Sequence, residues 1–302
     1  MELLVAGQIA LAAVQDVLFA TAAGSLACAV LGTHSGMGAP ATLRGWQAGL
    51  VIALALTALA YLWLQAAVMS GSPLAGAGDA VAAVLTQSHF GVAWSVGFVG
   101  ALLATLSRIA GRRGLPLFAV GLLVWAAGKA AASHAADAGD FSVREGIHLV
   151  HLCATALWAG SVIVASVILR RAAPVADASA GQRAAAFRLG LSHLATAALL
   201  VVLITGLYNV MQDTAQAGVP FFGTAWGRVL SAKLACVAAA VALGGWNRWL
   251  ILPDLCANAQ QDGPVFMAAL GRFDAWLTVE ALVMLAVLVF AAVLGHTSPT
   301  GG

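Results

Sequence analysis

Long, unbroken apolar runs recur along this sequence and constrain its fold more than any other feature. A bilayer core about 30 Å thick needs about 20 apolar residues per spanning helix, and only helices or closed barrels satisfy the backbone in lipid. The short alternating segments that mark a barrel are absent from the sequence. With 62% hydrophobic and 9% charged residues, a soluble globule and a disordered chain are both excluded. The sequence therefore predicts an all-α, polytopic transmembrane helix bundle.

The apolar runs predict about eight spans in a single transmembrane domain covering residues 1–302. The first run lacks a positive n-region and is too long for a signal peptide, so we expect it in the mature protein. In the longest connection, the apolar spacing of residues 79–87 indicates a short interfacial helix. The expected spans are 3–31, 46–70, 90–110, 115–136, 146–170, 188–212, 228–252 and 265–295.

The Lys and Arg residues are distributed unevenly between the two sides of this predicted bundle. With alternating spans, 10 of the 14 fall on one side, and only Arg144 and Arg228 fall on the other. Cytoplasmic loops carry the excess of positive charge, so both termini are expected in the periplasm. The periplasmic side then carries an acidic excess, with Glu2, Asp79, Asp137, Asp140, Glu145 and Asp213.

Histidines gather at the predicted outer side, which holds five of the seven. Histidine is the commonest metal ligand and is costly to bury in lipid without a partner. His151 follows His148 at the i, i+3 spacing, so a helix places both on one face, where they can chelate one ion or simply form hydrogen bonds. The outer histidines are His89, His134, His148, His151 and His296, and the inner ones are His34 and His193.

Sulfur ligands give a weaker signal. Met69 and Met211 lie near the outer ends of their spans, where their thioethers suit Cu(I), although packing is the commoner role. The four cysteines are scattered and form no CxxC motif, so neither a disulfide framework nor a structural zinc site is expected.

Four ionisable residues fall inside the predicted spans: Asp16, Lys129, Lys233 and Glu280. Such residues are candidates for function by default, and burial is tolerated mainly when they are paired or face water. Two acids and two bases allow the pairs Asp16 with Lys129 and Lys233 with Glu280. These pairs either fix helix packing or form a polar pathway for a cation or proton.

Several motifs in chain order resemble the copper resistance protein D (CopD) family. The resemblance is strongest over residues 85–295 and is carried by Leu85 to Gly91, Ser133 to Ala136, His148 to Gly160, Ser192 to Asn209, Trp226 to Leu234, and Gly245 to Arg248 with Pro253. It implies that the family's motif histidines fall on His89, His134, His148 and His151. It places the family's lysine and asparagine on Lys233 and Asn247.

The resemblance implies a multi-pass copper protein of the bacterial inner membrane that moves copper between periplasm and cytoplasm. It also implies a small periplasmic CopC-type copper carrier as a partner, beside membrane lipid. We expect copper import through the outer histidines, with Asp16, Lys233 and Glu280 along the route. No enzymatic motif is present, and no nucleic-acid partner is expected. A haem b electron-transfer protein, with His134 and His148 as haem ligands, and a non-transporting assembly factor are the alternatives.

Overall fold

The protein is a bundle of long helices in the computed structural model, which describes residues 2–38, 41–108, 114–171, 177–214, 223–260 and 263–297. These ranges contain no strand. The shorter segments in these ranges are α3 (Gly78–Gln87), α9 (Leu252–Ala257), the 3-10 turns Leu74–Gly76 and His134–Ala138, and the π-helical segment Asn247–Ile251. The long helices are α1 (Glu2–His34), α2 (Ala41–Ser70), α4 (His89–Ser107), α5 (Leu115–Ala131), α6 (Val143–Arg170), α7 (Ala178–Thr214), α8 (Ala225–Trp246) and α10 (Pro264–Leu294).

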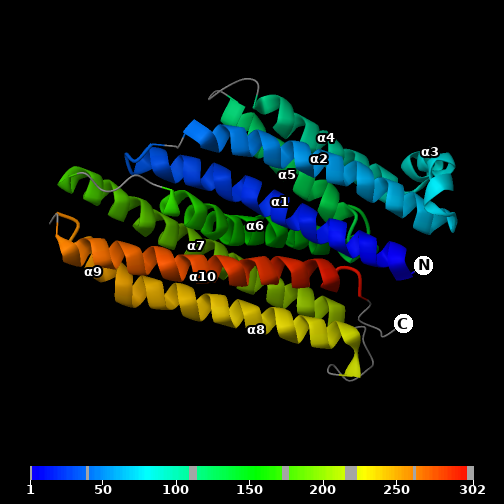
Figure 1. Ribbon diagram of the computed structural model, residues 1–302. Helices are drawn as coiled ribbons and strands as arrows, with labels where there is room; N and C mark the ends of the chain where they lie inside the picture. Colours follow the sequence, from blue (N-terminus) through cyan, green and yellow to red (C-terminus); the bar gives the residue numbers. More distant parts are fainter. Residues whose placement is uncertain are drawn as a thin grey trace.

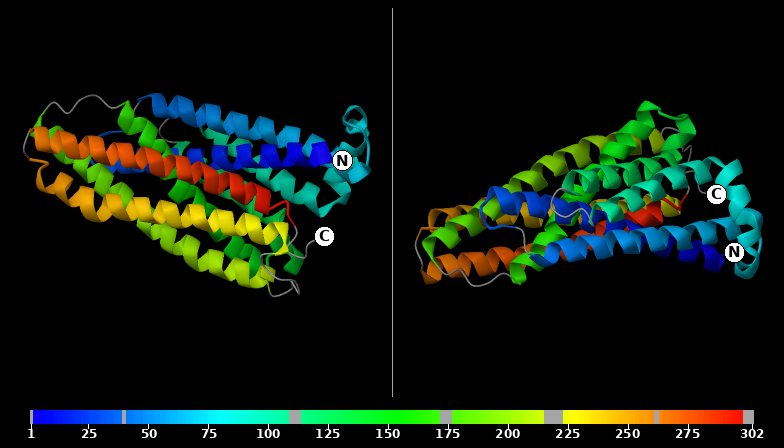
Figure 2. Two further views of the ribbon diagram at one scale, coloured as in Figure 1. Left: turned by 60° about the horizontal axis from the view of Figure 1, so that its bottom comes forward. Right: turned by 90° about the horizontal axis from the view of Figure 1, so that it is seen from above.

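The long helices run side by side along one axis (Figures 1 and 2). In the described ranges, seven helical stretches are long and apolar enough to cross a membrane, and α5 is a shorter apolar helix of 17 residues. The predicted polytopic helical bundle is thereby confirmed. The start of α1, the end of α10 and α3 lie together at one end, which we call the outer end. The start of α10 and α9 lie at the opposite, inner end.

Several expected boundaries differ from the structure, and three of the differences have a clear local reason. The fourth span ends at Ala131 rather than 136, because Ser133 accepts a hydrogen bond from the Ala135 N–H and starts a 3-10 turn. The helix predicted over residues 79–87 is confirmed as α3, over Gly78–Gln87, and its position at the membrane interface stays a prediction.

The sixth span starts ten residues earlier than expected, at Ala178. Asp177 caps this helix, accepting hydrogen bonds from the Ser179 hydroxyl and the Ala180 N–H, which lower the pKa of its carboxyl. Because α7 is about 56 Å long, it extends beyond the bilayer core.

The seventh span is interrupted near its inner end. After α8, residues Asn247–Ile251 form a π-helical segment, and Pro253 stands in the first turn of α9. A proline cannot donate the backbone hydrogen bond that a regular helix needs at this position, so the preceding turn widens.

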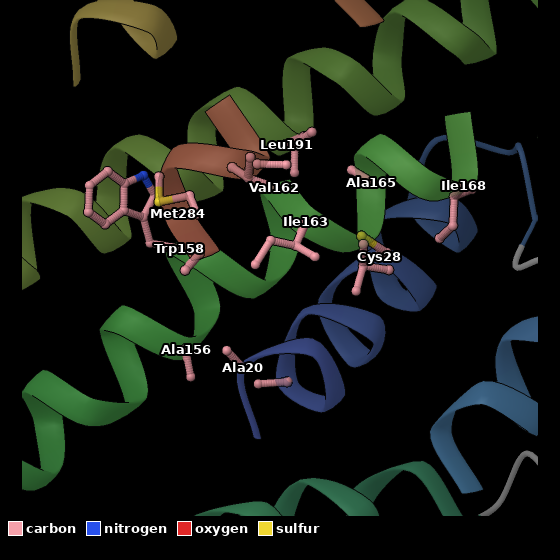
Figure 3. Packing of buried hydrophobic residues seen from close by; sticks show 14 of the residues in the cluster. Ala20, Cys28, Ala156, Trp158, Val162, Ile163, Ala165, Ile168, Leu191 and Met284 are labelled. Atoms are coloured by element: carbon pink, nitrogen blue, oxygen red, sulfur yellow. The ribbon is translucent and has the colours of Figure 1, made fainter. Parts of the chain in front are cut away.

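Helix α6 forms the centre of the bundle. The buried share of its most apolar window is 72%, against 17% to 39% in the other spanning stretches. Figure 3 shows its Trp158, Val162 and Ile163 packed among residues of α1, α7 and α10. Because α6 is packed on several sides, the backbone positions of its polar residues are fixed by the surrounding helices.

Glycines allow α1 to cross α6 at backbone contact. A Cβ atom added at Gly160 would lie 1.7 Å from the Ala20 carbonyl oxygen, and one added at Gly24 would lie 2.0 Å from the Gly160 carbonyl carbon. No side chain fits in either place, so this crossing depends on both glycines.

Charged side chains also pack inside the inner half. Arg188 of α7 donates from Nη2 to Asp274 Oδ2 of α10 at 2.7 Å, and the side chains are only 5% and 20% exposed. The charge count places these two residues on the cytoplasmic side, yet they form a buried ion pair that joins two helices.

Candidate metal-binding site

The paired histidines stand near the outer end of α6. Ser142 caps this helix by accepting a hydrogen bond from the Glu145 N–H, and the helix continues without interruption to Arg170. His148 and His151 therefore share one face, as their spacing predicts. Their ring centroids lie 6.4 Å apart with planes inclined by 23°. At this separation both rings can turn toward one ion.

Thr205 of α7 determines which nitrogen of His151 carries the proton. The Thr205 hydroxyl donates its single proton to the Val201 carbonyl oxygen at 2.6 Å. Its oxygen also lies 2.9 Å from His151 Nδ1, so in that contact it accepts and His151 Nδ1 donates. The proton of a neutral imidazole is then on Nδ1, which leaves the lone pair on Nε2. A second residue that fixes the tautomer in this way is the usual support of a metal-binding histidine.

Two further residues of α7 complete this side of the site. A Cβ atom at Gly206 would lie 3.2 Å from His151 Cε1, so the bare glycine makes room for the ring. Asn209 Nδ2 lies 3.4 Å from His148 Nδ1. Thr205 and Asn209 are one turn apart, which matches the spacing of the two histidines on α6. This role of Thr205 and Asn209 was not predicted from the sequence, where the signal was two polar residues at i, i+4 in an apolar stretch.

Charged groups surround the histidine pair. Lys129 of α5 forms an ion pair with Asp16 of α1, which confirms the first predicted pairing. Arg144 donates to Asp213 at 2.7 Å. The charge of Lys233 acts on both histidines and is attracted by Asp16 and Asp213. Two acids thus face three bases, and one positive charge is left over beside the pair.

The other outer histidines form separate contacts. His89 Nε2 lies 2.7 Å from Asp140 Oδ1, and both side chains are more than half exposed. His134 is exposed in the 3-10 turn and lies near enough to His148 for their charges to interact. The exposed side chains of Met69 and Met211 are not enclosed with the pair.

His296 is joined to α2 rather than to the pair. Its Nδ1 donates to the Ala292 carbonyl oxygen at 2.8 Å, so Nε2 holds the lone pair and accepts a hydrogen bond from the Tyr61 hydroxyl at 3.1 Å. In the part of the chain that the structure describes, no three His, Cys, Asp or Glu side chains come together as a ready metal cage. The two histidines of α6 are therefore the core of the candidate site.

Comparison with protein families identifies the family of the chain. Residues 184–294 match the family model described as copper resistance protein D, and residues 2–143 match the one described as copper resistance protein D-like, N-terminal domain. The chain belongs to the copper resistance protein D family. It is thus a multi-pass membrane protein of copper resistance and homeostasis. No curated protein and no solved structure matches the chain.

The family matches extend the resemblance seen in the sequence. They reach back to residue 2, beyond the stretch from about 85 that the motifs marked. Residues 144–183 lie outside both matches, and they include the histidine pair. The family matches therefore support copper handling by this chain. The role of His148 and His151 in metal binding is argued only from their spacing and their contacts with α7.

The second predicted ion pair of this copper resistance protein is wrong. A Cβ atom at Gly244 would lie 3.1 Å from Glu280 Oε1, so the Glu280 carboxyl lies against α8 at that level. Lys233 is eleven residues earlier on α8, about 16 Å away along the axis. Asn247 lies one turn beyond Gly244, on the inner side of Glu280. Lys233 belongs to the outer cluster, and Glu280 and Asn247 belong to a second polar region.

Proposed function

We propose that this protein receives copper through His148 and His151 at its outer end and passes it across the bacterial inner membrane, with import as the favoured direction. In this proposal the outer end faces the periplasm, as the distribution of Lys and Arg predicts. Copper is the cargo, and the protein acts as a transporter rather than an enzyme.

One observation carries the proposal: His151 Nδ1 lies 2.9 Å from the Thr205 hydroxyl, whose own proton is directed to the Val201 carbonyl oxygen. From this contact we infer that Nδ1 carries the imidazole proton and that Nε2 has the lone pair. A neutral imidazole with one nitrogen so anchored is prepared to bind a metal ion with the other. His148 stands on the same face of α6 at a spacing that suits the same ion. Imidazole is a good ligand for copper, in agreement with the family.

The surroundings of the pair support an outer entrance. The exposed His89 and Asp140 and the nearby His134 offer further ligands at the outer end. An acidic surface attracts cations and raises their local concentration. We propose a small periplasmic CopC-type carrier as the copper donor at this surface. Asp16, Lys233 and Glu280 would then lie along the route inward.

Copper binding to purified variants tests the site. The double variant His148→Ala with His151→Ala is loaded with copper in detergent, desalted and analysed for bound metal. We expect the copper stoichiometry to fall by about one ion per chain. The matched control, His34→Ala with His193→Ala, removes two histidines at the inner end and should bind as the unchanged protein does. Unchanged stoichiometry in the α6 variant would refute the site.

Membrane vesicles of known orientation test the direction. Right-side-out and inside-out vesicles are compared for uptake of copper with and without the protein. Import predicts faster uptake into right-side-out vesicles that carry the protein. Faster uptake into the inside-out vesicles would show export instead.

A further inference from the structure

Glu280 is a buried carboxyl group near the middle of α10. It stands 16 residues from the start of this 31-residue helix, and the residue is 4% exposed. The described residues offer it neither a hydrogen bond nor an ion pair. A carboxylate in such a place would be an uncompensated charge in lipid, which is costly. The Glu280 carboxyl therefore needs either a hydrogen-bond donor or a proton, because none of the ion pairs described above includes it.

Helix α8 presents a second unsatisfied group to α10. The Asn247 side chain donates from Nδ2 to the Phe273 carbonyl oxygen of α10 at 3.5 Å, while its Oδ1 is buried without a hydrogen-bond partner. Gly244, one turn earlier, lies against the Glu280 carboxyl. Both Gly244 and Asn247 thus face α10. Gly244 and Asn247 are three residues apart, so the carboxyl and the amide meet this helix interface at positions on α8 that are about one turn apart.

The local backbone marks this region as unusual. Asn247 begins the π-helical segment that interrupts the span. Such π-helical turns are rare and often occur at functional sites, where they reorient a side chain. Gly244 keeps the approach to the carboxyl open, because any larger residue would press on it.

No other charged group near Glu280 on the packed helices is available as its partner. On α8, Lys233 lies about 16 Å toward the outer end. On α1, Asp16 is paired with Lys129. On α6, the charged side chains are at the two ends, with Arg144 and Glu145 at the outer end and Arg170 at the inner end, and the other titratable groups, His148, His151 and the Cys153 thiol, lie in the outer half.

The inner charges are also engaged. Arg248 of the π-helical segment donates to the hydroxyls of Ser192 and Thr196 on α7. On α10 itself, Asp274 is paired with Arg188. Asp254 of α9 is exposed at the inner end. Two acceptor groups, the carboxyl and the amide oxygen, are left on one interface, and the described part of the chain shows no hydrogen-bond donor to either.

We propose that Glu280 carries an exchangeable proton, which it donates to Asn247 Oδ1, and that release of this proton accompanies the passage of copper. Protonation turns one carboxyl oxygen into a donor and satisfies both groups at once. In the coupled step, the O–H bond of Glu280 breaks and its proton leaves to water. The carboxylate that remains offsets one positive charge of the copper ion. The second half of this inference rests on the proposed copper transport; the first does not.

Infrared spectroscopy of the full chain in lipid nanodiscs tests the protonated pair without copper. The unchanged protein should show the C=O stretching band of a protonated carboxylic acid at neutral pH, and Glu280→Gln should lose it. Asn247→Leu should shift the band to the position of a weakly bonded acid. The control Asp254→Asn alters an exposed carboxyl and should leave the band in place. The absence of the band from the unchanged protein, or its persistence in Glu280→Gln, would overturn the proposal.

Proteoliposomes test the coupling. Copper uptake and internal pH are recorded together, the latter with an enclosed pH-sensitive dye. We expect copper-dependent proton movement, at least tenfold reduced in Glu280→Gln, whose amide can still donate to Asn247 and keep the fold. Asp254→Asn should couple normally. Copper movement without protons in the unchanged protein overturns the coupling and leaves the transport proposal standing. If the unchanged protein moves no copper, both coupling and transport fail, and the infrared result still decides the protonated pair.

Discussion

The Thr205 hydroxyl should contribute to copper affinity although it is not expected to touch copper. In Thr205→Val the side chain keeps its shape and loses its hydroxyl, which donates to the Val201 carbonyl oxygen within α7 and accepts from His151 Nδ1, 2.9 Å away. The buried N–H is then unsatisfied, and the ring is free to move its proton to Nε2, the nitrogen assigned to the metal. Loss of such a supporting hydrogen bond typically weakens metal binding about 10- to 100-fold, or about 1.4 to 2.7 kcal/mol.

The assay is competition with a chromophoric copper chelator, using protein in detergent. Thr205→Ser restores a hydroxyl at the same place and should recover most of the affinity. The control Thr57→Val removes a hydroxyl that donates to Leu54 within α2, and it should bind copper normally. Nitrogen NMR of labelled histidine reports the tautomer directly. Wild-type affinity in Thr205→Val, in a protein whose His151→Ala variant has lost binding, would refute the reasoning.

Other predictions concern packing, charge and the alternative cofactor. Gly160→Ala should prevent correct folding, because its methyl group would overlap the α1 backbone, whereas Gly146→Ala on the same helix has open space and should keep the unfolding temperature in detergent. Lys233→Gln removes the surplus charge beside the histidines and should tighten copper binding several-fold at low salt, with less effect at high salt; equal affinities at low salt would contradict this. Purified protein should show no Soret band in its absorption spectrum, since a band would favour haem.

Much of the fold could be predicted because lipid leaves few choices. The long apolar runs required helices, and the spacing of His148 and His151 required a shared face. The pairing of Asp16 with Lys129 was predictable from charge balance and depth, although charge balance alone suggested Lys233 with Glu280 just as readily. Which helices are neighbours decides between such pairings, and no single run of sequence contains that information.

The support of the site was harder to predict. Thr205, Gly206 and Asn209 are common residues in membrane helices, and their meaning appears only when α7 lies beside α6. The π-helical turn at Asn247 was likewise not expected, although Pro253 was visible six residues later. A proline indicates that a helix is disturbed, but the surrounding packing determines whether it kinks, ends or widens.

The histidine pair lies on the central helix α6, between the two parts of the chain that the family models match. One family match ends at the first residue of this helix and the other begins after it, at residue 184, so α6 lies between two matched segments, here called modules. Its glycine contact joins it to α1 of the first module, and its hydrogen bond to Thr205 joins it to α7 of the second. If the two modules move relative to each other, the contacts of α6 with α1 and α7 transmit the movement to α6 from both sides. The geometry of a metal ion bound to His148 and His151 would then depend on the relative position of the two modules.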